Sequence, residues 1–352
     1  MGSTGSAGAG LPRLVLLALL LLSALAAVAA SGPGAAEGFH GKGDGDTVFV
    51  SVASYRDSEC AATVRDLFER ADRPDRVFVG VCEQNSREEE GGERCVGPAL
   101  PPRVRRVSIA HTEALGPTYA RYLCSTLYRG ETWYMQIDSH TRFVRGWDTK
   151  AVANARLCPS PRAILTHYPR KVEEMAGGDA GVPVLCKSKF NQHGVPSFES
   201  VIMKPPADSV PRRVPFVSGG FVFMPGSAVR EVPFDPDLPN LFQGEEILHS
   251  ARLWTAGYDF FTPLENIVYH HYGRAGQPKF WDADAGDAGA YRRTQDATLS
   301  KVRRLLGLEQ PPLPGYAHGM GRARSLAAYW AFAGVDPAAR TSDSQSRFCR
   351  AS

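Results

Sequence analysis

Three consecutive residues, Asp138-Ser139-His140, carry side chains that could hold a metal ion. They follow the apolar run from Trp133 to Ile137, which predicts a buried strand. Residues two apart in an extended chain project to the same side, so the carboxylate and the imidazole can approach one ion. A hard carboxylate with an imidazole suits Mn²⁺ or a similar divalent cation. The alternative is a polar strand terminus, because a DxH triplet is a short pattern.

A third protein ligand is expected from Val268-Tyr269-His270-His271-Tyr272. Adjacent residues in a strand point to opposite faces, so only one of the two histidines should reach the metal. We favour His271 for this role. The alternative is that one histidine is structural and the other lies at the surface.

Two carboxylates, Glu245 and Glu246, begin the amphipathic pattern that runs from Gly244 to Trp254. One of them would face the reacting groups of a substrate, and the other would be solvated or structural. Acidic residues in the first turn are also the ordinary preference of a helix, because they complement its dipole. Both are therefore candidate catalytic residues with a structural alternative.

Several further residues could contact a diphosphate or nucleotide. Arg56 and Arg121 are the best cations, since a planar guanidinium matches phosphate, although either could form a surface salt bridge instead. Asp57 could accept a hydrogen bond from a base or ribose, or begin the following helix. Two glycines would let the backbone approach a ligand, or would form a tight turn. The candidate binding residues are Ser54, Arg56, Asp57, Arg121, Asp138, Ser139, Gly219 and Gly220.

Alternating apolar segments predict the framework that positions these residues. Strands are expected at 47–53, 76–81, 104–109 and 133–138, and helices at 59–70 and 117–128. This β-α-β order indicates an α/β fold, with a mostly parallel central sheet and helices on both faces. Ligands of such sheets collect beyond the carboxyl ends of the strands, where residues 54–57 and 138–140 would both lie.

The second half of the chain is less regular. The segment from Pro169 to Pro196 contains few large hydrophobic residues and is expected to be a mobile or substrate-facing loop. Helices are expected at 244–254 and at 290–306, and residues 214–224 are apolar around a Ser-Gly-Gly sequence. Because no internal repeat or later linker interrupts the pattern, one catalytic domain is the simplest interpretation.

The N-terminal segment indicates the cellular compartment. Leu14 to Ala30 is an uncharged apolar run, and its length lies between a signal-peptide core and a membrane span. A type II signal anchor is slightly favoured over a cleaved signal. Either interpretation directs the rest of the chain to the secretory lumen. The Gly-rich residues 31–46 predict a stem or linker.

Cysteine content indicates the redox compartment, and net charge argues against one class of partner. The seven cysteines suit an oxidising compartment. Cys82 and Cys95 flank a Glu-rich loop and are the first expected disulfide, whereas Cys124 is expected to be a buried thiol. With 40 basic and 37 acidic residues, the net charge is only +3, and no basic run with interleaved aromatics occurs. Nucleic acid is therefore not expected as a partner.

Linked motifs give the sequence a resemblance to a known family. From about Thr47 to Gly334 it resembles the polypeptide α-N-acetylglucosaminyltransferases, which include a hydroxyproline-modifying enzyme and enzymes that start mucin-type O-glycans in some protists. The motifs are Phe49 to Asp57 (FVSVASYRD), Gly116-Pro117, Ala120-Arg121-Tyr122, Gln136 to His140 (QIDSH), Arg142-Phe143, Gly146-Trp147-Asp148, Pro233-Phe234-Asp235-Pro236, Leu241 to Glu246 (LFQGEE), Arg252 to Thr255 (RLWT) and Gly257-Tyr258-Asp259.

The resemblance implies a GT-A glycosyltransferase fold, UDP-GlcNAc as donor, a divalent metal and an α-linkage formed with retention of configuration. It makes Asp138 and His140 the DxD-like element. It leaves Glu245 or Glu246 a positioning or charge-stabilising role, because retaining GT-A enzymes have no agreed protein nucleophile. The hydroxyproline-modifying member is cytoplasmic, whereas the apolar N-terminus here favours Ser or Thr of secreted or surface proteins as acceptor.

The expected organisation is a signal anchor or signal peptide at 1–30, a stem at 31–46, the catalytic domain at 47–335 and a C-terminal tail at 336–352. The expected protein is a single-pass type II membrane protein of the Golgi, or a secreted protein if the signal is cleaved. It would bind a nucleotide-sugar donor and a polypeptide acceptor. Two other functions stay open: the same fold with UDP-GalNAc or a glycan acceptor, and a non-catalytic lumenal sugar-binding protein.

Overall fold

The computed structural model of the chain describes residues 1–2, 45–86, 94–178, 181–273, 276–282, 288–343 and 346–350. Residues 43–352 form one compact unit, and residues 1–42 form a separate one of which only the first two are described. The apolar run from Leu14 to Ala30 thus lies outside the described residues. Among the residues that are described, no helix has the length and apolar character needed to cross a bilayer.

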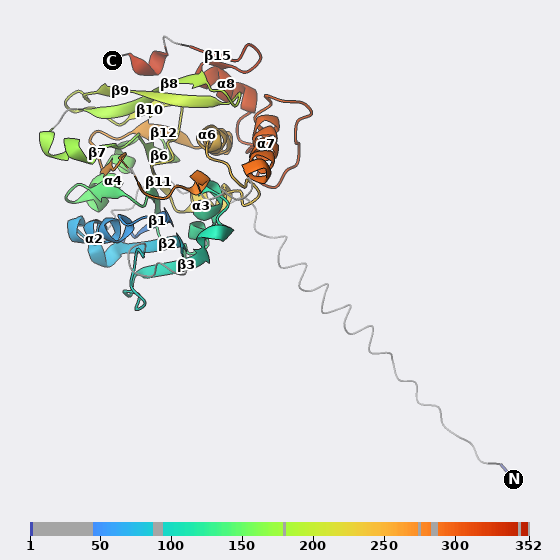
Figure 1. Cartoon of the computed structure of the whole chain (residues 1–352). Coiled ribbons are helices and arrows are strands. Elements are labelled where there is room, and N and C mark those ends of the chain that lie inside the picture. The colour runs from blue at the N-terminus through green and yellow to red at the C-terminus, as the bar shows by residue number, and fades with distance from the viewer. Residues whose placement is uncertain are drawn as a thin grey trace. The chain divides into compact units, whose positions relative to one another are not determined.

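An eight-stranded sheet forms the centre of the large unit, in the order β10-β12-β6-β11-β4-β1-β2-β3 (Figure 1). Four of its seven neighbouring pairs are parallel, and β11 and β10 run antiparallel to their neighbours. Its strands are β1 (Val48–Tyr55), β2 (Val77–Asn85), β3 (Val104–Ala110), β4 (Trp133–Asp138), β6 (Ala163–Thr166), β10 (Arg212–Val214), β11 (Phe221–Pro225) and β12 (Asp259–Thr262).

Helices cover both faces of this sheet, as Figure 1 shows. On one side lie α2 (Cys60–Arg70) and α4 (Trp147–Leu157). On the other lie α3 (Pro117–Ser125), α6 (Glu245–Thr255) and α7 (Ala288–Leu305). The predicted α/β class, with a mostly parallel sheet and helices on both faces, is confirmed, as are the four predicted N-terminal strands and the helices between them. Shorter helices are α5 (Ser227–Glu231), α8 (Leu326–Ala333), η1 (Pro74–Arg76), η2 (His111–Glu113), η3 (Val172–Gly177), η4 (Phe280–Asp282) and η5 (Arg347–Cys349).

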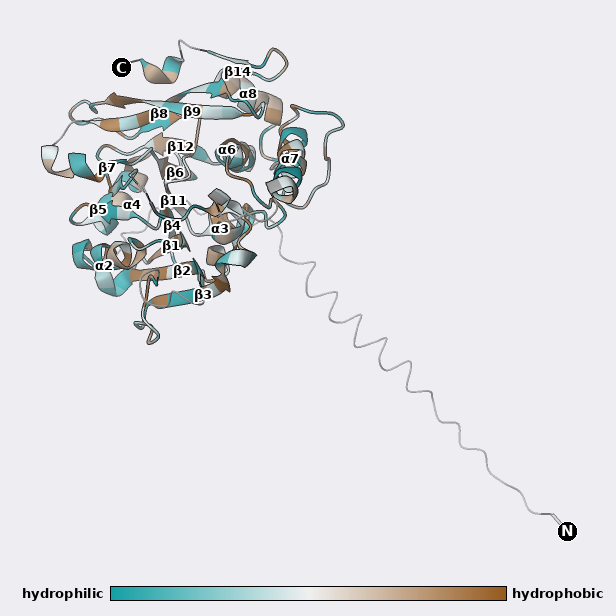
Figure 2. Cartoon of the chain, viewed as in Figure 1, coloured by the Kyte–Doolittle hydropathy of each residue, from teal (hydrophilic) through white to brown (hydrophobic). Residues whose placement is uncertain are grey.

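Alternation along β1 shows how the sequence builds two cores. Val50 and Val52 pack with Leu67 of α2, whereas Phe49 points to the opposite face and packs in the same core as Ile247 of α6. All five are fully buried. A strand buried on both faces must be apolar at successive positions, which is why β1 reads as a continuous apolar run. The apolar strands inside and the more polar outer helices, such as α7, are visible in Figure 2.

A second, three-stranded sheet has the order β5-β13-β7, and its strand β5 directly follows Asp138-Ser139-His140. Its strands are β5 (Thr141–Phe143), β13 (Val268–His270) and β7 (Arg170–Lys171). The antiparallel pairing of β13 with β5 sets His270 opposite Thr141, the residue after the Asp138-Ser139-His140 sequence. This register brings two segments about 130 residues apart to the same place.

The segment from Pro169 to Pro196, expected to be a mobile or substrate-facing loop, is in part a β-hairpin, so the prediction of a loop is wrong for residues 182–190. Strand β8 (Val182–Phe190) pairs with β9 (Pro196–Met203), with a bulge between Leu185 and Lys187. The short apolar stretch from Val182 to Leu185 is buried, and this burial stabilises the strand. The strand was not predicted because the segment contains few large hydrophobic residues.

The C-terminal segment is part of the fold and not a separate tail. Strands β14 (Val335–Asp336) and β15 (Thr341–Ser342) form a short ladder. Phe348 is buried, and a disulfide joins Cys186 of β8 to Cys349. Residues 336–350, as far as they are described, therefore continue the domain that was expected to end at residue 335.

The first predicted disulfide, Cys82–Cys95, is also wrong. Cys95 is bonded to Cys60 at the start of α2, and both pack in the core on the α2 face of the sheet. Cys82 belongs to β2 and points to the other face, where it packs against Ala120 and Cys124 of α3. Successive residues of a strand face opposite ways, so Cys82 cannot reach the α2 side. Cys124 is a buried thiol, as expected.

Candidate active site

A cleft with a volume of about 880 Å³ opens at the carboxyl ends of β1 and β4. This is the edge at which parallel sheets bind their ligands. The first residue of α6, the turn before β11 and the end of β13 also reach it. The predicted site residues among its lining are Arg121, Asp138, Ser139, His140, Gly219, Gly220, Glu245 and Glu246.

Asp138, His140 and His270 form a group that could hold a metal ion. Their potential ligand atoms all lie within 4.8 Å of one another. The Asp138 Oδ2 lies 3.1 Å from the His270 Nε2, and the rings of His140 and His270 have centroids 4.4 Å apart. One carboxylate and two imidazoles are a donor set that suits Mn²⁺ and neighbouring divalent ions.

The structure reverses our preference between the two adjacent histidines. The His271 Nε2 lies 3.8 Å from the Glu59 carboxylate, on the opposite face of the strand end from His270, and His271 is not in the group. The His271 backbone nitrogen instead donates to the His140 carbonyl over 3.0 Å. The sequence showed that only one histidine could reach the metal, but the register of β13 decides which one.

The His140 ring contacts the carboxylate of Asp57, a residue that is fully buried. The Asp57 Oδ2 lies 2.7 Å from the His140 Nδ1 and accepts a 2.6 Å hydrogen bond from the Ser139 hydroxyl. Thr63 of α2 lies beneath the same turn, with its hydroxyl 2.7 Å from the Ser139 carbonyl oxygen. Asp57 was expected to contact a nucleotide or begin a helix. In the structure it packs against the turn and does not line the cleft.

Arg121 of α3 joins the metal group to α6. Its guanidinium forms an ion pair with Glu245, donates to the Gly219 carbonyl over 3.1 Å and lies 3.6 Å from the Asp138 Oδ1. Burial would lower the pKa of Arg121, but the charges of Glu245 and Asp138 outweigh it and raise that pKa above its ordinary value. Burial likewise opposes ionisation of Asp138, but its hydrogen bond to His270 and the surrounding positive charges lower its pKa.

Glu246 occupies the next position and has different partners. Its carboxylate accepts hydrogen bonds from the Gly219 backbone nitrogen, at 2.6 Å, and from the Tyr168 hydroxyl, at 2.7 Å. Burial and the adjacent charge of Glu245 raise the pKa of Glu246 to about 7, against the opposing effect of these hydrogen bonds. Both predicted carboxylates therefore line the cleft. Glu245 is paired with the Arg121 cation, whereas Glu246 has a pKa of about 7.

Gly219 and Gly220 leave room that any side chain would occupy. A Cβ on Gly219 would lie 2.6 Å from the Glu245 Oε1, and a Cβ on Gly220 would lie 3.4 Å from the Asp138 Oδ2. Because β11 runs antiparallel to β4, the turn before β11 meets the carboxyl end of β4. A side chain at Gly219 would therefore displace the Glu245 carboxylate, whereas a Cβ at Gly220 would make a near-ordinary contact with the metal group.

Two other predicted residues are placed differently. Ser54 is fully buried, and its carbonyl oxygen accepts a hydrogen bond from the Gln84 side chain over 3.1 Å. Arg56 adopts a left-handed backbone conformation with φ 45°. Tyr55, the last residue of β1, lines the cleft, whereas the neighbouring Ser54 and Arg56 do not.

Sequence reasoning missed several aromatic residues of the cleft. Tyr272 lies beside His270 and Tyr168 lies beside Glu246, while Phe242 and Trp281 also line the cleft, with ring centroids 4.7 Å apart. A signal existed for Phe242 and Tyr272, which lie within three residues of the predicted Glu245 and His271. Trp281 follows no predicted motif, and only the fold brings it to the cleft.

Comparison with solved structures reveals similar folds at low sequence identity. The crystal structure of GalNAc-T7 with UDP, GalNAc and Mn²⁺ matches with a TM-score of 0.52 and 14% identity, over 81% of this chain and 56% of that one. S. aureus TarS 1–349 matches with a TM-score of 0.41 and 13% identity, over 64% and 60%. The chain thus spans little more than half of the GalNAc-T7 chain, and the first likeness supports the GT-A fold alone. No curated protein matches the chain.

A family model defines the relationship over most of the sequence. The model described as glycosyltransferase (GlcNAc) matches residues 47–98 and 98–339, which include every residue of the cleft described above. The chain therefore belongs to the GlcNAc glycosyltransferase family.

Proposed function

We propose that the protein transfers N-acetylglucosamine from UDP-GlcNAc to a hydroxyl of a polypeptide, with retention of configuration and with a divalent metal, Mn²⁺, at the leaving group. The observation that carries this proposal is the grouping of Asp138, His140 and His270 in the cleft of a GlcNAc glycosyltransferase. Membership of the GlcNAc glycosyltransferase family supports transfer of this sugar, and Asp138-Ser139-His140 at the end of β4 supports a nucleotide-sugar donor.

The residues fit a divalent cation. His140 uses its Nδ1 towards Asp57, which leaves its Nε2 for an ion, and Asp138 is ionised. A metal-bound histidine commonly has a carboxylate at its other nitrogen, as His140 has here. When bound, the ion would neutralise charge that develops on the diphosphate of the departing nucleotide.

The remaining cleft residues would orient the donor and the acceptor. Arg121 contacts Glu245, the Gly219 carbonyl and Asp138, and so links α6, the Ser-Gly-Gly turn and the metal group. Glu246 has a pKa raised to about 7 and accepts a hydrogen bond from Tyr168, which suits it to form a hydrogen bond with a sugar or acceptor hydroxyl. Both roles are positional, and no residue is assigned as a nucleophile.

Exposed aromatic rings at the cleft support a polypeptide acceptor. Phe242, Tyr272 and Trp281 are respectively 48%, 51% and 45% exposed, and they are the exposed large aromatic side chains among the described residues. All three line this one cleft. Clustered exposed aromatics mark binding surfaces, and apolar side chains or proline rings of a peptide would bury them. UDP-GalNAc as donor and a glycan as acceptor are the alternatives that the assays below distinguish.

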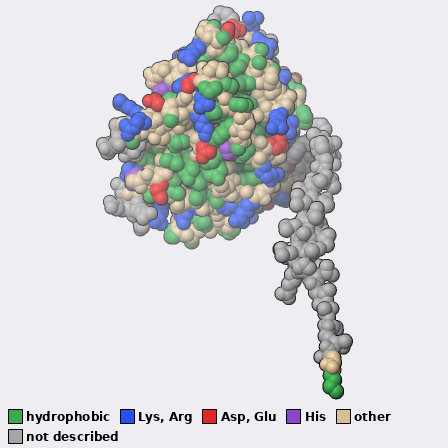
Figure 3. Space-filling view, turned by 90° about the vertical axis from the view of Figure 1, so that its right-hand side faces the viewer, with side chains coloured by type: hydrophobic (Ala, Val, Ile, Leu, Met, Phe, Trp, Pro, Cys, Tyr) green, Lys and Arg blue, Asp and Glu red, His purple; other side chains and the backbone are tan. Residues whose placement is uncertain are grey.

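We also propose that the reaction occurs in the lumen of the secretory pathway, with the protein anchored in the Golgi membrane as a type II protein. The two disulfides support an oxidising compartment, and the uncharged run from Leu14 to Ala30 supports an anchor or a signal. On the face drawn in Figure 3, basic and acidic side chains are interspersed.

The test combines a donor panel with a metal-site variant. UDP-GlcNAc or UDP-GalNAc is incubated with Mn²⁺ and either free oligosaccharides or peptides that contain Ser, Thr or hydroxyproline, and mass spectrometry detects the products. UDP-GlcNAc should give a mass increase of one N-acetylhexosamine, in α-linkage by NMR. Asp138→Ala should abolish the Mn²⁺-dependent turnover, while Asp75→Ala, which changes an exposed carboxylate, should not.

Four results would overturn parts of the proposal. Normal turnover by folded Asp138→Ala would remove the metal assignment. Turnover with UDP-GalNAc in place of UDP-GlcNAc would change the donor, and transfer only to glycans would change the acceptor. A wild-type protein that binds neither Mn²⁺ nor UDP would indicate a non-catalytic lumenal protein.

A further inference from the structure

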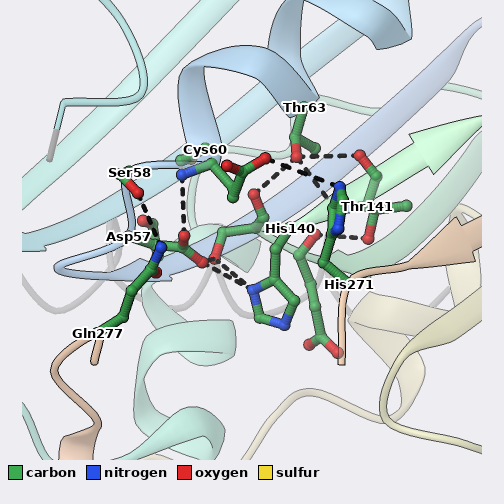
Figure 4. A network of polar contacts seen from close by, with 12 residues as sticks. Asp57, Ser58, Cys60, Thr63, His140, Thr141, His271 and Gln277 are labelled. Carbon is green, nitrogen blue, oxygen red and sulfur yellow. Dashed lines mark hydrogen bonds and ion pairs between the residues drawn. The ribbon is translucent and has the colours of Figure 1, made fainter. Parts of the chain in front are cut away.

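The environment of Asp57 is unusual for a residue at the end of a β-strand beside a substrate cleft. Its carboxylate is fully buried, and both oxygens are used. The Oδ1 accepts a 3.0 Å hydrogen bond from the Glu59 backbone nitrogen, and the Oδ2 faces the Ser139 hydroxyl and the His140 Nδ1. Figure 4 shows Asp57 between the loop before α2 and His140, with its carboxylate directed at one nitrogen of the imidazole.

Burying a carboxylate is costly unless hydrogen bonds and nearby charge compensate for it. A plain helix start would need only the Glu59 contact, which a serine or asparagine could provide as well. The additional contacts to Ser139 and His140 hold the turn between β4 and β5. Those two residues are separated from Asp57 by 82 and 83 positions, so the contacts join distant segments.

We propose that Asp57 is the positioning residue of the metal site, and that it acts by fixing the tautomer and the orientation of the His140 ring. This inference rests on the proposed metal-dependent function. An ionised carboxylate can only accept hydrogen bonds, so the His140 Nδ1 facing it must carry the proton. The Nε2 of the neutral ring then keeps its lone pair and is directed towards Asp138 and His270.

Two features hold Asp57 in place for this role. The Cys60 backbone nitrogen donates to the Asp57 carbonyl over 3.2 Å, and Cys60 is tied by its disulfide to Cys95. Beneath the same turn, the Thr63 hydroxyl is within 3.0 Å of the Thr141 carbonyl oxygen. The first turn of α2 is thereby fixed to the residues on either side of His140, as Figure 4 shows.

The network makes Asp57→Asn an informative change. The Glu59 nitrogen can only donate, so the amide oxygen of the asparagine must occupy the Oδ1 position. The amide NH₂ group then faces the His140 Nδ1 and donates to it, which moves the ring proton to the Nε2. A protonated Nε2 cannot bind a metal ion, although the volume of the side chain and the fold are retained.

The experiment measures Mn²⁺ binding by the full chain without donor, using electron paramagnetic resonance of free Mn²⁺. The wild type is compared with Asp57→Asn, His140→Ala and the double variant. Asp57→Asn should weaken Mn²⁺ binding by about 10- to 100-fold, the usual effect of losing a carboxylate behind a metal-bound histidine. In the His140→Ala background the same change should have little further effect, because Asp57 acts through His140.

Asp148→Asn is the matched control. Asp148 is also a buried carboxylate, and it accepts 2.8 Å hydrogen bonds from the backbone nitrogens of Asp72 and Arg73, with no histidine among the hydrogen-bond partners of its carboxylate in the described part of the chain. Asp148→Asn should lower the Tm and leave the Kd for Mn²⁺ unchanged. A purely structural role for Asp57 would instead give Asp57→Asn this same pattern.

A measurement on the unsubstituted protein covers the case in which Asp57→Asn does not fold. In ¹⁵N-histidine-labelled protein without metal, the His140 signal is assigned by its loss in His140→Ala. His140 should be the tautomer protonated on Nδ1, and protonation on Nε2 would overturn the inference. Unchanged Mn²⁺ binding in Asp57→Asn, or equal losses in the presence and absence of His140, would also overturn it. A wild type that binds no Mn²⁺ would instead refute the proposed function.

Discussion

The substitution Gly219→Ala tests whether the close packing of the Ser-Gly-Gly turn is required for the site to work. The new Cβ would lie 2.6 Å from the Glu245 Oε1 and 3.1 Å from the Arg121 Nη2. To restore an ordinary contact distance of 3.4 Å, the Glu245 carboxylate would have to retreat by about 0.8 Å. This movement separates Glu245 from Arg121, while the backbone conformation at Gly219 is open to alanine because its φ is not positive.

The magnitude follows from the interaction that is lost. A hydrogen bond between charged groups contributes about 1.5–3 kcal/mol, and about 1.4 kcal/mol corresponds to a factor of ten. If the Arg121–Glu245 pair is needed to orient the donor, kcat/KM should fall by about 10- to 150-fold. The change should appear mainly in the catalytic parameters, because the turn lies at the cleft and outside the two large cores.

The assay is the initial rate of UDP release at several donor concentrations, with the Tm measured in parallel. Gly177→Ala is the control, since its added Cβ would meet nothing within 4 Å and its φ is not positive. The control should retain kcat/KM within about twofold, as surface substitutions away from special features usually do. A Gly219→Ala protein with kcat/KM within threefold of the wild type would show that the Arg121–Glu245 pair does not support turnover.

Two further predictions concern stability. The pKa of Glu246 is raised to about 7 from an ordinary 4.5, so the folded state binds more protons than the unfolded state between these values, and stability should fall as the pH rises through that window. Urea unfolding at pH 5 and pH 7.5 should show a smaller fall for Glu246→Gln, and an equal fall would contradict the environment described. The Cys186–Cys349 disulfide joins residues 163 positions apart, so Cys349→Ser should cost about 2–5 kcal/mol. Calorimetry should show this loss, with Cys158→Ser as the control outside the disulfides, and equal Tm values for Cys349→Ser and the wild type would refute it.

The parts of the fold with strong periodicity were predictable from the sequence. Strands β1, β2 and β4 are mostly apolar runs because both faces of the sheet are covered there, and this pattern placed Asp138 at a strand end. The helix after Gly244 was also predictable, because its apolar positions recur at helical spacing. These elements, with the polar residues that follow them, were sufficient to predict a metal and diphosphate edge.

The roles of some residues were predicted wrongly because those roles depend on side-chain directions and long-range contacts, which a single sequence does not contain. His270 and His271 differ only in the direction of their side chains, and a strand of three residues is too short for its pattern to define a face. Cys82 and Cys95 flank one loop, but β2 directs Cys82 away from that side. The function of Asp57 depends on contacts across more than 80 residues, so its position before a helix gave only a local interpretation.

The two disulfides differ in how much of the chain must be present before they can form. Cys60 and Cys95 are 35 residues apart, so the bond beside Asp57 can close soon after the first strands have been translated. Cys186 must wait for Cys349, 163 residues later, although it lies on the hairpin whose turn residues Asn191 and Gln192 line the cleft. The first bond needs only the chain up to Cys95, whereas the second needs the chain up to Cys349. A chain that ends before Cys349 could therefore form the bond beside Asp57, but its β8–β9 hairpin would lack the covalent tie to the C-terminal segment.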